Sequence, residues 1–190
     1  MQKKSQFLSF FLILVILISF SCRKGENDPL FSLRTRKARI TGVWKLQSGT
    51  YSYDSPGTYN LEVEYDGANA TERLNGTVKN SYPFTISFTI NKDFTFERVT
   101  DENRFRKIEK GSWFFNKKSK ELDLKNKEAI VLSISSIESS GKTTAYGGAR
   151  ADEILIIDKL KNDELIFKAE NTFTSSKIET EKYEMNYLKF

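Results

Sequence analysis

The sequence predicts an all-β protein, an antiparallel up-and-down β-barrel of about 8–10 strands. Three observations support this fold. Apolar residues recur at every second position along most of the chain, short turns separate these segments, and helical periodicity is essentially absent. Short links require antiparallel neighbours, and strands without covering helices must close on themselves or stack in two layers. A meander of this length favours the barrel over the sandwich.

The composition excludes several chemical classes. The 190 residues include no His and one Cys, which excludes histidine-dependent nucleophilic catalysis, His-containing zinc sites and intrachain disulfides. No pair among the 25 acidic residues is singled out by its position, so we expect no enzyme, no metal site and no cofactor. Removing residues 1–21 removes Lys3 and Lys4 and leaves 28 of the 30 basic residues against 25 acidic ones. This near balance gives no support for a nucleic-acid partner.

Residues 1–21 are expected to form a signal peptide and are excluded from the fold reasoning. A basic start is followed by fourteen largely apolar residues, 7–20. As a helix, this segment would measure about 21 Å, which is short of the roughly 30 Å hydrocarbon core that a spanning helix must cross. A signal-peptide core therefore fits the segment better than a membrane span.

The only cysteine, Cys22, lies where a signal peptidase would cut. The segment resembles the lipobox of bacterial lipoproteins: Ser21 agrees with the small residue usual before the cysteine, whereas Ser19 replaces the usual Leu. The resemblance implies that Cys22 is acylated and anchors the chain in a membrane. Arg23 replaces the Asp that often retains lipoproteins in the inner membrane, which implies the outer membrane of a Gram-negative cell. An uncleaved anchor and a plain secretory signal are the alternatives.

We expect residues 22–30 to be a flexible tether, because they are polar and aperiodic, and residues 31–190 to form the barrel domain. A short helical turn is expected around residues 32–38. Period-two alternation then predicts strands over 40–48, 59–65, 72–79, 83–90, 94–99, 104–115, 120–125, 129–137, 153–160, and 164–170 followed by 178–189.

Gly42 and Trp44 lie on the first expected strand, directly after the helical turn. This Gly-x-Trp pattern resembles that of lipocalins, and the continuation is similar to the lipocalin-like domains of bacterial lipoproteins. Matching segments are Ile40–Leu46, Thr89–Phe96, Gly111–Phe115 with Trp113, Leu122–Leu124 and Lys161–Phe167. The resemblance implies that Trp44 packs across the closed end of a barrel that binds a small apolar or amphipathic molecule. From the residues themselves, we expect both tryptophans to be core residues.

The inward-facing set is the expected lining of any cavity. It comprises Tyr59, Leu61, Val63, Tyr65, Phe84, Ile86, Phe88, Phe94 and Phe96. A further aromatic, Tyr146, belongs to the long polar connection 138–153. We expect this segment to overhang the open end as a lid, and an unstructured loop without a function is the alternative. The hairpin at 161–164 is expected at the opposite end.

An eight-stranded barrel is wide enough either to be packed solid or to hold one small ligand, and the sequence leaves both outcomes open. A barrel with a cavity would bind a small hydrophobic molecule. A packed barrel would act as a structural or protein-interaction module with a partner in the cell envelope.

Overall fold

The computed structural model describes residues 34–121, 123–146, 152–174 and 178–190. The expected signal peptide (1–21), the tether (22–30) and Cys22 lie outside these residues. No helix in the described part of the chain combines the length and apolar character that a membrane crossing needs.

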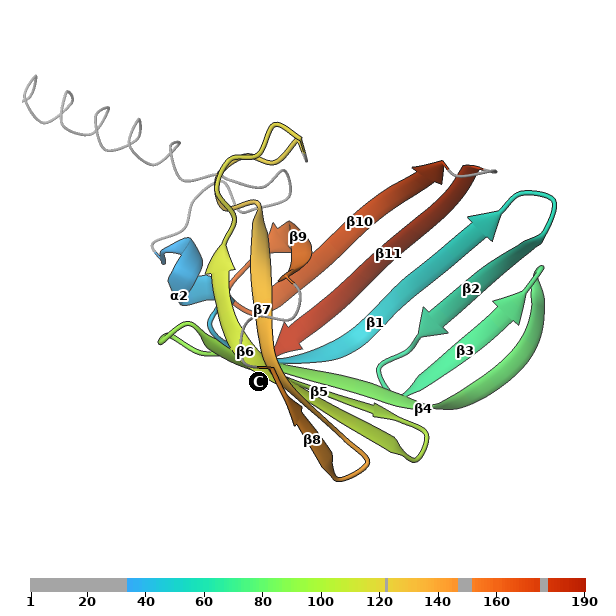
Figure 1. Ribbon diagram of the computed structural model, residues 1–190, viewed down its shortest axis with the longest axis horizontal. Helices are drawn as coiled ribbons and strands as arrows, with labels where there is room; N and C mark the ends of the chain where they lie inside the picture. The colour runs from blue at the N-terminus through green and yellow to red at the C-terminus, as the bar shows by residue number, and fades with distance from the viewer. Residues whose placement is uncertain (1–33, 122, 147–151, 175–177) are drawn as a thin grey trace, which may run out of the picture.

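Within the described residues, the fold consists of a short helix and a series of strands (Figure 1). The helix is α2 (Arg36–Ile40), and the strands are β1 (Gly42–Ser55), β2 (Tyr59–Tyr65), β3 (Asn69–Leu74), β4 (Thr77–Ile90), β5 (Thr95–Glu102), β6 (Phe105–Phe115), β7 (Ala129–Ser139), β8 (Lys142–Ala145), β9 (Asp152–Leu160), β10 (Glu164–Thr174) and β11 (Ile178–Lys189).

The strands form one closed antiparallel barrel with up-and-down topology, as the sequence predicts. The strand order is β6-β5-β4-β3-β2-β1-β11-β10-β9-β7-β8, and pairing between β6 and β7 closes the sheet. β1 pairs with β4 over residues 42–45 and with β2 over residues 49–55. Eight strands therefore form the ring at the end where β1 pairs with β4, and the β2–β3 hairpin inserted between these two strands brings the barrel to ten strands.

The eight-stranded end is the closed end, where α2 lies (Figure 1). The indole Nε1 of the fully buried Trp44 donates a hydrogen bond to the Ile40 carbonyl at 2.7 Å. The Lys189 ammonium lies 4.8 Å from the centroid of the Trp44 ring. Gly42 has a φ of +144°, and a Cβ there would lie 2.2 Å from Cε of Lys189. Only glycine fits this backbone position.

Trp113 is also a core residue, as expected, with 1% of its surface exposed. Its Nε1 donates to the Asn91 carbonyl at 2.9 Å, and its ring packs edge-on against Phe115 with centroids 5.5 Å apart. The 161–164 hairpin lies at this same closed end, with the Lys161 amide bonded to the Glu164 carbonyl at 2.8 Å.

Three segments differ from the sequence prediction. Residues 72–79 do not form one strand, because Asn75 and Gly76 both have positive φ and make the turn between β3 and β4. Of residues 120–125, the described ones form no strand and contribute only an isolated bridge to Leu124. In the predicted lid, 138–153, β7 continues to Ser139, and Ser140 and Gly141, both with positive φ, turn the chain into β8. Residues 147–151 of this segment lie outside the described residues.

Candidate ligand site inside the barrel

The closed half of the barrel is filled by side chains. The largest of these are almost fully buried: Trp44, Trp113, Phe88, Phe167, Ile40, Ile90, Ile130, Leu132, Leu160 and Leu165. Phe88 links its neighbours, with its ring centroid 5.9 Å from Phe96 and 6.4 Å from Phe167. These side chains form the buried core of the barrel, and two of them, Phe88 and Phe167, also face the cavity beyond it.

A cavity of about 180 Å³ lies beyond this packed half. It combines an apolar wall, three tyrosines and one pair of charged residues, contributed by β1, β4, β5, β9, β10 and β11. The lining residues are Tyr51, Ile86, Phe88, Arg98, Glu153, Leu155, Phe167, Tyr183, Met185 and Tyr187. The cavity is therefore formed by strands from both ends of the chain, which only the closed barrel brings together.

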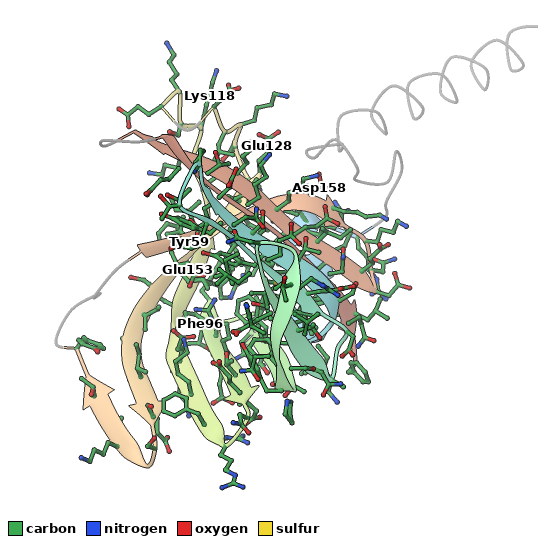
Figure 2. All side chains as sticks on the ribbon, turned by 90° about the vertical axis from the view of Figure 1, so that its right-hand side faces the viewer. Tyr59, Phe96, Lys118, Glu128, Glu153 and Asp158 are labelled. Atoms are coloured by element: carbon green, nitrogen blue, oxygen red, sulfur yellow. The ribbon has the colours of Figure 1, made fainter. Side chains whose placement is uncertain are left out.

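Arg98 joins two carboxylates across the barrel interior. Its Nε donates to Glu109 at 2.8 Å, and its Nη1 and Nη2 donate to the two oxygens of Glu153 at 3.0 and 2.6 Å. Lys107 adds a contact to Glu109 at 3.4 Å. In Figure 2, Glu153 lies between the strands, whereas Lys118 lies on the surface. Bidentate geometry of this kind is the strongest form of a charge-assisted hydrogen bond.

These contacts fix the protonation of the pair. Burial raises the pKa of Glu109, but the Arg98 guanidinium and the Lys107 ammonium outweigh this effect and hold the pKa below its ordinary value. Burial lowers the pKa of Arg98, and the carboxylates of Glu153 and Glu109 more than reverse that shift. Arg98 and Glu109 are therefore both charged near neutral pH.

Tyr183 and Tyr187 bring hydroxyl groups to the same cavity. Burial, followed by the charge of Glu153, raises the pKa of Tyr183 to about 12. Tyr187 is only 6% exposed, and burial raises its pKa as well. Among the described residues, neither hydroxyl has a hydrogen-bond partner. Neither hydroxyl is among the fully buried atoms that lack a partner, so both keep accessible surface and can form a hydrogen bond with a polar ligand atom.

A belt of tyrosines and glutamates continues from the cavity toward the open end. The Tyr82 hydroxyl donates to Glu72 at 2.9 Å, and Ser55 donates to Glu179 at 3.4 Å. Burial and then the charge of Glu102 raise the pKa of Tyr65 to about 12. We call this region the mouth. It contains Tyr51, Tyr53, Tyr59, Tyr65 and Tyr82 with Glu72, Glu102, Glu179 and Glu181.

The residues that the sequence predicts as cavity lining lie in different environments in the structure. Val63, Phe84, Phe88 and Phe96 are buried in the core, and Leu61, Tyr65 and Ile86 are partly buried against it. Only Ile86 and Phe88 of the predicted set line the cavity itself.

The remaining three predicted residues lie elsewhere. Tyr59 is 39% exposed and packs on Tyr53 in the mouth. Phe94, at 45%, lies over Trp113 at the closed end with the Lys37 ammonium 3.5 Å from its ring centroid. Tyr146 follows β8 and is half-buried, with its amide bonded to Ser135.

Sequence reasoning misses the charged part of the site. Arg98 lies two residues after the inward-facing Phe96, and Glu153 lies two residues before the inward-facing Leu155. Because residues two apart lie on the same face of a strand, both side chains point into the barrel. Tyr183 and Tyr187 likewise share one face of the last strand with Met185. A charged or phenolic side chain at an inward position is the signal that would have identified them.

A larger hollow of about 350 Å³ lies where the connection before β7 meets β9 and β10. Its rim is formed by charged side chains that reach solvent, among them Glu128, Asp158, Lys168 and Glu170. The smaller cavity has the apolar wall and the convergent polar groups typical of a ligand site, so we place the candidate site there. No family model, curated protein or solved structure matches the chain.

Proposed function

We propose that this protein binds one small amphipathic molecule inside its barrel. The proposal rests on one observation: side chains fill the closed half of the barrel, but a cavity of about 180 Å³ lies beyond them. Small-molecule sites are concave, mostly apolar and equipped with a few placed polar groups. Five apolar side chains, three tyrosines and the Arg98–Glu153 pair meet that description.

The cavity volume limits the ligand to a small apolar part. Pockets for drug-sized molecules have volumes of about 300–1,000 Å³, so this cavity accommodates a short chain or a single ring, with the polar part in the mouth. The cavity favours this function over that of a fully packed interaction module.

Binding without turnover is the activity that we propose. A general acid or base must exchange a proton near the working pH. The carboxylates of Glu109 and Glu153 are instead held by Arg98 at 2.8 and 2.6 Å. These contacts hold both carboxylates in fixed positions, where they shape the site.

A lipid anchor on Cys22 is part of the proposal. This part of the proposal rests on the lipobox-like sequence around the single cysteine. Arg23 directly after it would direct the barrel to the outer membrane. Two acyl chains are enough for stable membrane attachment.

A cavity-filling substitution tests the binding function. We expect 1-octanol to bind the parent barrel saturably and Ile86→Trp to abolish this binding, because the indole would occupy the cavity that Ile86 lines. Thr85→Trp is the matched control, since Thr85 is the exposed, outward-facing neighbour. NMR titration reports both binding and the intact fold. Equal octanol binding by the parent and Ile86→Trp, or no saturable binding by the parent, would contradict the proposal.

A further inference from the structure

Tyrosines dominate the lining of the cavity and its mouth. The chain has eight tyrosines, and seven of them share the interior face: Tyr51, Tyr53, Tyr59, Tyr65, Tyr82, Tyr183 and Tyr187. Inward orientation follows from strand register, since Tyr51 pairs with the buried Val63 and Tyr65 packs on Phe84 with ring centroids 4.8 Å apart. The faces of aromatic rings attract cations.

Carboxylates accompany these rings, and several have no counter-charge. Glu72, Glu102 and Glu179 form no ion pair with any described residue. The nearby cations Arg98 and Lys107 are already engaged by Glu109 and Glu153. These carboxylates give the mouth a negative potential. Burial is the largest cause of the raised pKa of Tyr65 and of Tyr82, and the charge of Glu102 raises the first further, as the hydrogen bond and charge of Glu72 raise the second.

The cavity next to the mouth offers a polar acceptor. Tyr187, with 6% of its surface exposed, lines it, and its hydroxyl forms no hydrogen bond with a described residue and keeps accessible surface. Arg98 does not make the cavity a receptor for anions, because two carboxylates already neutralise its charge. An incoming anion would first have to displace Glu153.

We propose that the ligand is an organic ammonium compound with a short apolar part. The apolar part fills the cavity against Ile86, Leu155 and Phe167, and the ammonium group lies among the tyrosine rings and carboxylates of the mouth. This inference rests on the proposed binding function and specifies the charge of the ligand.

Three probes that share one alkyl chain test the charge preference. Octylammonium, 1-octanol and octanoate are titrated separately into the barrel at low salt and followed by NMR. We expect octylammonium to bind about tenfold more tightly than 1-octanol, as cation–π contacts with two solvent-exposed tyrosine rings would supply, and octanoate to bind most weakly. Added NaCl should reduce the advantage of octylammonium, because the mouth is open to solvent.

The outcomes separate the two proposals. If none of the probes binds, the binding function itself is wrong, and the charge preference falls with it. If 1-octanol binds as tightly as octylammonium, the proposed binding in the cavity is still supported, but the inference that the ligand is an ammonium compound is overturned. Tightest binding of octanoate also overturns it and would identify Arg98 as the group that holds the ligand.

A variant that removes one negative charge from the mouth tests whether the preference for octylammonium arises there. Glu102→Gln should weaken octylammonium binding about threefold, the effect of one charge at roughly 7 Å in water, and leave 1-octanol binding unchanged. Glu62→Gln is the matched control, because Glu62 is equally exposed but lies on the outer face of β2. Equal losses in the two variants would show a general charge effect and contradict a role for the mouth.

Discussion

Among single residues, Arg98 sets the electrostatics of the barrel interior. Its side chain is 15% exposed and that of Glu109 is 5% exposed, so the pair is largely withdrawn from water. Each charge alone would be costly to bury, and each is tolerated because the other is present. The more exposed Glu153 completes the coordination of the guanidinium from the opposite side of the barrel.

Arg98→Met should therefore lower the free energy of unfolding by about 3–5 kcal/mol at pH 7, because it leaves the Glu109 carboxylate buried without its partner. The difference shrinks in acid. The depressed pKa of Glu109 stabilises the parent above the ordinary value of 4.5, and this contribution is lost as the pH falls below that value. Denaturant titrations should show the gap in the free energy of unfolding between parent and variant narrowing as the pH is lowered below about 4.5.

The double variant Arg98→Met/Glu109→Gln is the control. It removes the orphaned charge and should recover part of the loss at pH 7. A loss that does not change with pH, or no recovery in the double variant, would show that Arg98 stabilises the barrel through packing alone.

At the level of elements, the barrel consists of a closed ring and two additions to it. The β2–β3 hairpin is inserted between β1 and β4, and each of its strands is paired on both edges. The β8 strand is different, because its four residues pair only with residues 136–139 of β7. We expect β8 to open independently, since local stability follows local pairing and burial.

Gly141→Val tests this difference. Gly141 has a φ of +73°, and a Cβ there meets nothing within 4 Å, so the substitution adds only backbone strain. We expect hydrogen-exchange protection to be lost within β8, with a change below about 0.5 kcal/mol in the global free energy of unfolding. The matched Gly76→Val, at the same φ in the β3–β4 turn, should cost about 1–2 kcal/mol globally. Equal global losses would show that β8 belongs to the cooperative unit.

The sequence predicts these elements well where one face of a strand is uniformly apolar. Residues 59–65 are predicted with the observed bounds of β2, and the positions of Trp44 and Trp113 follow from pattern alone. The same rule fails for the cavity. Arg98 and Glu153 are charged residues at inward-facing positions. Their ion pair joins two strands that are far apart in the sequence, so the local alternation of apolar and polar residues cannot predict it.

At the scale of the whole molecule, the closed ring gives the barrel two unlike ends. The closed end carries α2 and the packed tryptophans, and the open end carries the mouth (Figure 1). The described chain enters at the closed end, immediately before α2.

The proposed anchor predicts how the full chain fractionates. Cys22→Ser should abolish palmitate labelling and either release the protein into the soluble fraction or leave its signal segment uncleaved. Fractionation and labelling of parent and variant in parallel test this, with Ser21→Ala as a control that keeps a small residue before the cysteine. A Cys22→Ser protein that is still labelled and still sediments with membranes would refute the anchor.

The proposed anchor would also limit how a guest molecule reaches the cavity. Arg34 is twelve residues from Cys22, so a fully extended chain between them reaches at most about 40 Å. An anchor on Cys22 would therefore be joined to the barrel at its closed end, where α2 lies, and the mouth is at the other end. Under this proposal a guest molecule would arrive by diffusion through water rather than by lateral movement out of a leaflet. Its solubility, as much as its fit, would then decide whether the barrel collects it.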